Sequence, residues 1–138
     1  MEKKCTNTPF LTLMQTSKAI HERIKTEMVK NKLSITEFSV LEVLYHQGKQ
    51  TIQQIAKSIL ISSGSMTYVI DKLEQRDLLS RVACPDDRRV IHVVLTDKGT
   101  EWMDQIMPEY HELVNGMFSS LNEQERETLV QLLKDIKV

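Results

Sequence analysis

The sequence has 138 residues, of which 41% are hydrophobic and 27% charged, and its formal net charge is −1. This length suits one domain with its own core, and no apolar run approaches the roughly 20 residues that span a bilayer, so we expect no membrane segment. The first ten residues lack the apolar core of a signal peptide. The two cysteines, Cys5 and Cys84, are far apart in sequence, which favours a reduced, cytoplasmic protein.

The pI of about 6.4 bears on nucleic-acid binding, because domains that bind nucleic acids often have a pI above about 9. Affinity of this chain for phosphates must therefore come from a local group of cations. The overall charge neither supports nor excludes DNA binding.

Apolar spacing and capping residues mark the helices of the first half. A helix is predicted from Phe10 to about Lys32. The capping box Ser34-x-x-Glu37 begins a second helix, which Gly48 ends.

A helix-turn-helix is predicted next. The capping box Thr51-x-x-Gln54 begins a short helix, and Ser62 or Ser63 is expected to cap a longer one. The inward face of the longer helix carries Met66, Val69, Ile70 and Leu73. A short helix, a tight turn and a longer helix give this motif by spacing alone.

Two strands are predicted at residues 79–84 and 90–95, which are rich in β-forming residues and flank a turn. The turn places Asp86, Asp87, Arg88 and Arg89 at the tip of a β-ribbon. Thr96 is expected to cap a long helix, and Asn122-x-x-Glu125 to begin the last one. The fold class is therefore mostly α with a small β-wing, a winged helix-turn-helix.

The predicted chain is compact and has three parts: an N-terminal arm and first dimerisation helix (1–33), the winged helix-turn-helix (34–96) and C-terminal dimerisation helices (97–138). The winged part cannot also cover the apolar faces of the terminal helices. We therefore expect a homodimer, whose two recognition helices, about 34–36 Å apart, would read a palindromic operator in double-stranded DNA.

The wing carries a resemblance to the MarR family of transcriptional regulators. The family signature is Asp-x-Arg, a short strand and Leu-Thr-x-x-Gly, matched here by Asp87-Arg88-Arg89, residues 90–94 and Leu95-Thr96-Asp97-Lys98-Gly99. The resemblance covers nearly the whole chain and implies a DNA-binding regulator, expected to be a repressor. Asp77 stands where the family commonly has a helix-ending Gly, for which we expect a small stability cost and no change of fold.

The recognition helix supplies the first group of expected DNA contacts. Hydroxyl groups near its start can reach base edges or phosphates, small residues allow close approach, and a lysine further along would position the helix on the backbone. This group is Ser62, Ser63, Gly64, Ser65, Thr67, Tyr68 and Lys72. The alternative is that Ser63 only caps the helix and the others are solvated.

The wing supplies the second group. If it follows the family, Arg89 enters the minor groove, Asp87 orients its guanidinium, and Arg88 contacts a phosphate. The alternative is an exposed turn with solvated charges.

The resemblance also implies an effector, either a small aromatic or phenolic molecule or an oxidant. Residues suggested by sequence position for a ligand pocket are His21, Tyr45, His46, Trp102 and Tyr110. Cys5 is a candidate redox sensor, whereas Cys84 is expected to be structural.

Other functions have weaker support. The four histidines show no metal-binding spacing, and neither a nucleophile motif nor a phosphate-binding loop occurs, so we expect no metal, no cofactor and no enzyme. The alternative from another class is a winged helix that binds a protein, such as an antirepressor. The low pI favours this alternative, and the arginines of the wing count against it.

Overall fold

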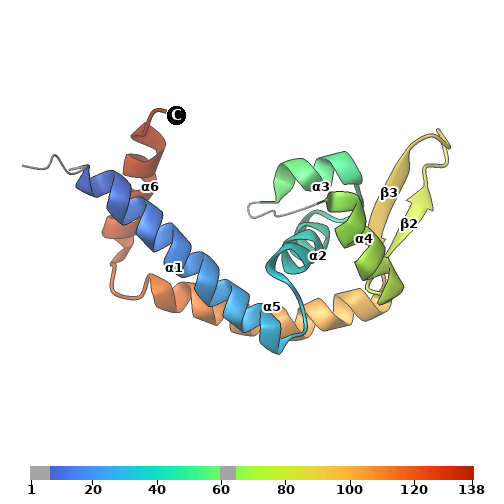
Figure 1. The fold of residues 1–138 in the computed structure, drawn as a ribbon, viewed down its shortest axis with the longest axis horizontal. Helices are drawn as coiled ribbons and strands as arrows, with labels where there is room; N and C mark the ends of the chain where they lie inside the picture. The colour runs from blue at the N-terminus through green and yellow to red at the C-terminus, as the bar shows by residue number, and fades with distance from the viewer. Residues whose placement is uncertain (1–6, 60–64) are drawn as a thin grey trace, which may run out of the picture. The chain divides into compact units, whose positions relative to one another are not determined.

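The computed structural model describes residues 7–59 and 65–138 and confirms a mostly helical chain with a small antiparallel sheet (Figure 1). The elements in chain order are α1 (Thr8–Lys30), α2 (Ile35–Gln47), β1 (Gln50–Thr51), α3 (Ile52–Ser58), α4 (Met66–Gln75), β2 (Leu79–Ala83), β3 (Ile91–Leu95), α5 (Asp97–Met117) and α6 (Glu123–Asp135).

All three predicted capping boxes are present, which is why these helix starts could be located from the sequence. The Ser34 hydroxyl accepts the Glu37 N–H at 3.0 Å, and the Glu37 carboxylate accepts the Ser34 N–H at 2.8 Å. The same reciprocal pattern begins α3 and α6. Each box satisfies two backbone donors that a helix start otherwise leaves without a partner.

The start of the recognition helix α4 differs from the prediction. Its N-cap is Ser65 rather than Ser62 or Ser63, and Ser62, Ser63 and Gly64 lie outside the described residues. Several small polar residues in succession are nearly equivalent caps, and none is followed by the Glu or Gln that would complete a capping box. Sequence pattern alone therefore could not select the residue.

The core of the winged part surrounds α2, which contacts α1, α3, α4 and β3. The fully buried side chains that fill it come from every one of these elements. They include Met28, Phe38, Leu41, Ile55, Ile70, Leu73 and Val93. Since Val69, Ile70 and Leu73 are all buried, the recognition helix turns its opposite side outward.

The sheet has the strand order β1-β3-β2, with all neighbours antiparallel. The paired strands β2 and β3 are the predicted β-ribbon, in the register Leu79 with Leu95 and Ala83 with Ile91. β1 was not predicted, because a strand of two residues carries no alternation that a sequence can reveal. Val93 is buried, whereas Ile91 is 40% exposed because the ribbon extends beyond the core as a wing.

The chain divides into two compact units, and the boundary in sequence falls between Met103 and Asp104, within α5. The first unit includes α1, because Ile24 and Met28 are buried in it. In the second unit, Arg126 donates two hydrogen bonds to the Phe118 carbonyl and fixes the turn before α6. The predicted parts 1–33, 34–96 and 97–138, and the expectation that they form one compact chain, stay predictions.

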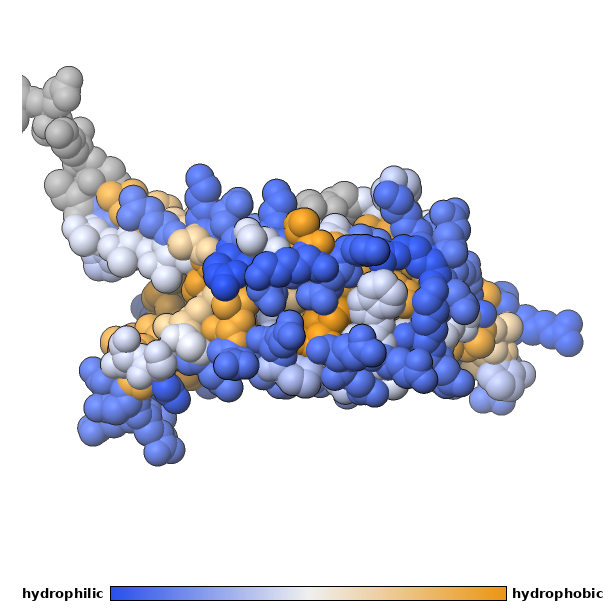
Figure 2. Space-filling view, turned by 90° about the horizontal axis from the view of Figure 1, so that it is seen from below, coloured by the Kyte–Doolittle hydropathy of each residue, from blue (hydrophilic) through white to orange (hydrophobic). Residues whose placement is uncertain are grey.

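Large apolar side chains remain exposed on the terminal helices of the chain. Near the start of α1 they are Phe10, Leu11, Leu13 and Met14, and on α6 Val130, Leu132 and Leu133. Hydrophobic side chains also reach the surface between hydrophilic ones on the face shown in Figure 2. Among residues 7–59 and 65–138, no helix combines the length and apolar character needed to cross a bilayer.

Candidate nucleic-acid interface

Four of the residues that were predicted to contact DNA belong to the described part of the chain, and they lie on the outward side of α4. Ser65, Thr67, Tyr68 and Lys72 are all exposed, and Tyr68 retains 59% of its accessible surface. The Lys72 ammonium lies 5.1 Å from the centre of the Tyr68 ring, a cation–π contact that organises both side chains. This side of the helix therefore presents hydroxyl groups and a positive charge.

The wing tip holds one arginine in a fixed direction. The Asp87 carboxylate accepts hydrogen bonds from the Arg89 backbone N–H at 3.0 Å, from Nε at 3.1 Å and from Nη2 at 3.2 Å. These bonds, first those of the side chain and then that of the backbone, lower the pKa of the Asp87 carboxyl. The Arg89 side chain is nevertheless 90% exposed, and Arg88 beside it is also exposed.

A second arginine, Arg81, joins the base of the wing to α4. Its guanidinium is 2.5 Å from the Asp71 carboxylate and 2.6 Å from that of Glu74, and its backbone N–H donates to Glu74 at 3.1 Å. The hydrogen bond to Asp71 is the main cause of the raised pKa of Arg81. Arg81 was not among the residues predicted from the sequence to form the interface. The available signal was a charged residue in a half-buried strand, which requires partners.

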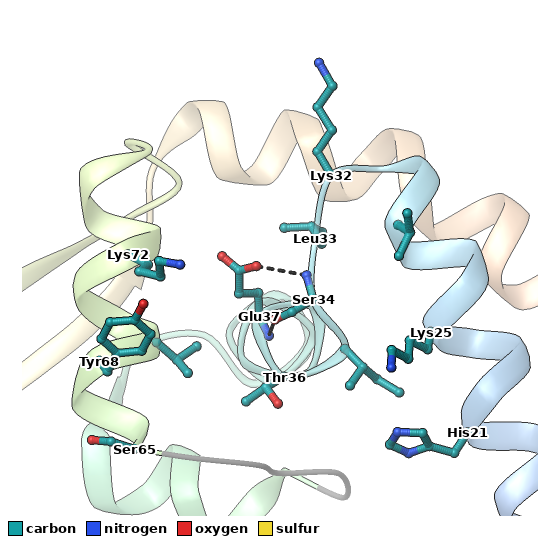
Figure 3. Close-up of a pocket in the computed structure, with 13 residues that line it drawn as sticks. His21, Lys25, Lys32, Leu33, Ser34, Thr36, Glu37, Ser65, Tyr68 and Lys72 are labelled. Atoms are coloured by element: carbon teal, nitrogen blue, oxygen red, sulfur yellow. Dashed lines mark hydrogen bonds between the residues drawn. The ribbon is translucent and has the colours of Figure 1, made fainter.

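An open cavity of about 720 Å³ lies beside the recognition helix, between α4, α1 and the start of α2 (Figure 3). Side chains of α1 and α4 lie on opposite sides of it, including His21 and Lys25 on α1 and Tyr68 and Lys72 on α4. The full lining is His21, Lys25, Val29, Lys32, Leu33, Ser34, Ile35, Thr36, Glu37, Ser65, Tyr68, Val69 and Lys72.

The cavity combines apolar side chains with cations. Glu37 is the carboxylate of its lining, and this group already accepts the Ser34 N–H and pairs with Arg76. Among the described residues, the ammonium groups of Lys25 and Lys72 form no ion pair with a carboxylate. The arrangement can therefore accommodate a small anion with an apolar body.

The structure does not bring the five expected pocket residues together here. His21 lines the cavity, whereas Tyr45, His46 and Trp102 are not among its lining residues, and Tyr110 belongs to the second compact unit. Tyr45 and His46 contact each other at the end of α2, and Trp102 stacks with Arg76. Spacing along a helix does not reveal which side chains a distant element covers.

The cysteines give no added support to a redox site. Cys5 lies outside the described residues, so its candidate role is untested. Cys84 is half-buried at the end of β2, where its N–H donates to the Val90 carbonyl at 2.9 Å. Within the described ranges, no cluster of three or more His, Cys, Asp or Glu residues is placed to hold a metal ion.

Comparison with known proteins gives a consistent result. The model of the MarR family matches residues 33–91. The HTH-type transcriptional regulator MhqR of Bacillus subtilis is 42% identical over 127 residues, covering 92% of this chain and 88% of that protein. The HTH-type transcriptional regulator YkoM of the same organism is 41% identical over 117 residues, covering 85% of this chain and 76% of that protein.

A solved structure agrees over almost the whole chain. The structure of Bordetella bronchiseptica BpsR, whose DNA binding is regulated by 6-hydroxynicotinic acid, superposes with a TM-score of 0.82 at 25% identity. The match covers 99% of this chain and 100% of BpsR.

Proposed function

Because this chain belongs to the MarR family of transcriptional regulators, we propose that it is a homodimeric repressor that binds a palindromic operator and is released by a small aromatic acid. The observation that carries DNA recognition is the wing tip, where Asp87 holds the exposed Arg89 guanidinium through three hydrogen bonds. An exposed arginine held by a carboxylate is prepared to enter a groove, because part of its side-chain freedom is already lost before DNA binds.

In the proposed complex, α4 lies in the major groove and the wing follows the adjacent minor groove. Ser65, Thr67 and Tyr68 face the base edges, while Lys72 contacts the sugar-phosphate backbone. Arg89 enters the minor groove, where a narrow A·T-rich segment has a strongly negative potential. Arg88 contacts a phosphate.

A second copy of the chain is the proposed partner of the exposed apolar residues on α1 and α6. On α6, Leu132 is 59% and Leu133 44% exposed, and on α1, Phe10 is 53% exposed. The two helices also carry opposite net charge, since α1 has four basic and two acidic side chains and α6 two basic and four acidic ones. Apolar and electrostatic complementarity together favour association between α1 and α6 of two copies.

The cavity beside α4 is the proposed effector site. Lys25 and Lys72 would attract a carboxylate, while Val29 and Val69 would contact an aromatic ring. The regulation of BpsR by 6-hydroxynicotinic acid supports a hydroxylated aromatic acid as the ligand class. Release requires only that the ligand bind the DNA-free conformation more tightly than the DNA-bound one.

The test begins with two sources of DNA. Duplexes that bind the purified protein are selected from a random-sequence pool, and DNA from upstream of the protein's own gene is tested beside them. We expect one dimer per palindrome, with affinity reduced about 10- to 100-fold in Arg89→Ala and unchanged in the control Arg23→Lys, which keeps the charge of α1. Failure to enrich any duplex, or equal affinity of Arg89→Ala and the parent, would contradict the proposal.

The effector and the dimer have separate readouts. Hydroxylated aromatic acids, with 6-hydroxynicotinic acid as the first probe, are expected to lower operator affinity, and Lys25→Gln to weaken this effect without changing operator affinity alone. Sedimentation should show a dimer, and Leu133→Asp should shift it toward monomer. A monomeric parent protein would exclude the dimer.

A further inference from the structure

The ends of α1 and α4 close in the same way, although they lie 45 residues apart in sequence. At the end of α1, Lys32 adopts a left-handed conformation with φ of 59° and donates to the Val29 carbonyl at 3.0 Å. The next N–H, that of Leu33, donates to the Met28 carbonyl at 3.0 Å. This pair of bonds is a Schellman motif, which satisfies carbonyl groups that a helix end would leave free.

The end of α4 repeats the pattern. Asp77 is left-handed with φ of 62° and donates to the Glu74 carbonyl at 2.9 Å. The Leu78 N–H donates to the Leu73 carbonyl at 3.1 Å, and Leu78 is fully buried. The recognition helix therefore ends at a defined residue, Arg76, which is its C-cap.

The Arg76 side chain connects these two motifs. Its Nη1 donates to the Lys32 carbonyl oxygen at 2.8 Å and lies 3.5 Å from the Glu37 carboxylate. Its guanidinium carbon lies 5.4 Å from the centre of the Trp102 ring. One side chain thus contacts the end of α1, Glu37 in the first turn of α2 and Trp102 in the first part of α5, and 31% of it remains exposed.

The backbone of the same segment is held from the α5 side. The Lys98 ammonium donates to the Arg76 carbonyl at 3.0 Å, and the Thr96 hydroxyl donates to the Asp77 carbonyl at 2.6 Å. These bonds hold the end of α4 to the start of α5, while the Arg76 side chain holds it to the end of α1 and the start of α2. The C-terminal end of α4 is therefore held from several directions.

From this geometry we propose that Arg76 is a positioning residue for operator recognition, an inference that rests on the DNA-binding function proposed above. Ser65 and Arg76 are separated by roughly 16 Å along the helix axis, so Arg76 does not reach the bases read at the helix start. It sets the direction in which α4 enters the groove. Recognition needs such support, because groups that read a ligand must be held within about 0.5 Å of their working geometry.

The contacts require arginine rather than any cation. A planar guanidinium can donate to the Lys32 carbonyl, pair with Glu37 and stack on Trp102 at the same time. The lysine ammonium is a single charged point and cannot form this combination. Arg76→Lys therefore keeps the charge that attracts DNA and removes most of the positioning contacts.

The test compares Arg76→Lys with Arg23→Lys, a matched change at an exposed arginine that pairs with Glu27 on α1. Full-length protein is titrated with the selected operator and with an unrelated duplex of equal length, over a range of salt concentrations. For Arg76→Lys we expect operator affinity about tenfold lower, comparable to one mismatched base pair. Affinity for the unrelated duplex and the salt dependence should stay unchanged, and Arg23→Lys should match the parent.

Glu37→Gln provides a second variant in case Arg76→Lys folds poorly. Glutamine keeps the capping box of α2 but removes the charge that pairs with Arg76. It should lower operator affinity in the same selective way, and its effect should not add to that of Arg76→Lys.

The opposing outcomes are distinct. Equal losses of affinity for the operator and the unrelated duplex, with a weaker salt dependence, would make Arg76 a phosphate contact. Unchanged operator affinity in both variants would show that Arg76 does not position α4. Either result overturns the inference. A parent protein that binds no duplex selectively would instead contradict the proposed function.

Discussion

Gly99 in the first turn of α5 lies directly against the carbonyl group of Leu78. A Cβ atom on Gly99 would be 1.9 Å from the Leu78 oxygen and 2.9 Å from its carbonyl carbon. The obstructing atoms belong to the backbone, and the same oxygen accepts the Thr96 N–H at 3.2 Å, so the group cannot move aside without breaking this corner. The end of α4 and the start of α5 can approach only because residue 99 has no side chain.

Gly99→Ala should therefore destabilise the protein strongly. We expect the free energy of unfolding to fall by about 3 kcal/mol, as for a severe overpacking change, measured by urea denaturation at a fixed protein concentration. Gly116→Ala is the matched control in the same helix, because a Cβ there meets nothing within 4 Å. The control should be neutral or stabilising by up to about 1 kcal/mol, and equal effects of the two changes would contradict the steric argument.

Arg81 is expected to stabilise the junction of the wing and the recognition helix. Its side chain is only 26% exposed and pairs with both Asp71 and Glu74. Arg81→Met should lower the free energy of unfolding by about 1–2 kcal/mol, because two half-exposed carboxylates lose a charged partner. Urea denaturation checks this, with Arg23→Met on α1 as the control, where the arginine side chain is 50% exposed and pairs with Glu27. A loss no larger than that of the control would show that solvent screens the Arg81 pairs completely.

Asp87 should contribute to operator binding throughout the neutral pH range. Its hydrogen bonds with Arg89 lower its pKa, so the ionised pair is complete above the ordinary aspartate range near about 4 and is lost only as the pH falls through the lowered value. Between about pH 5 and 8 this pair should therefore add no pH dependence. Asp87→Asn should weaken operator binding by up to about fivefold, a range typical of exposed ion pairs, with the same factor at each pH.

Fluorescence anisotropy with the selected operator at several pH values measures this factor. Because the Asp87 side chain does not contact DNA in the proposed complex, the salt dependence should be the same as in the parent protein. A factor that changed between pH 5 and 8 would show that another group titrates at the interface.

Local features of the fold were predictable because each depends on neighbours in sequence. The capping boxes at Ser34, Thr51 and Asn122 each require only a second residue three positions later. Asp77 stands where the family commonly has a helix-ending Gly, and the structure shows it left-handed at the end of α4. The ribbon between β2 and β3 followed from β-forming residues around a turn.

The features that were missed depend on residues far apart in sequence. Arg76 contacts Lys32, 44 positions earlier, and the cavity beside α4 is lined by residues from 21 to 72. No periodicity records such contacts, because they arise only when separate elements pack together. The expected ligand residues were chosen by position on single helices, which is why His21 alone among them lines this cavity.

The left-handed conformation of Asp77 gives a final prediction about stability. Its φ of 62° brings the Cβ of an L-residue close to the backbone, a cost that glycine avoids and that aspartate only reduces. Asp77→Gly should raise the free energy of unfolding by about 0.5–1 kcal/mol, less than the full relief of strain because glycine also gains freedom in the unfolded chain. Asp77→Ala should lower it, since alanine keeps the Cβ and loses the short polar side chain that tolerates this conformation. Urea denaturation of the three proteins therefore tests whether the free energy of unfolding falls in the order Gly, Asp, Ala at position 77. If the alanine variant were the most stable of the three, strain at this helix end would be negligible.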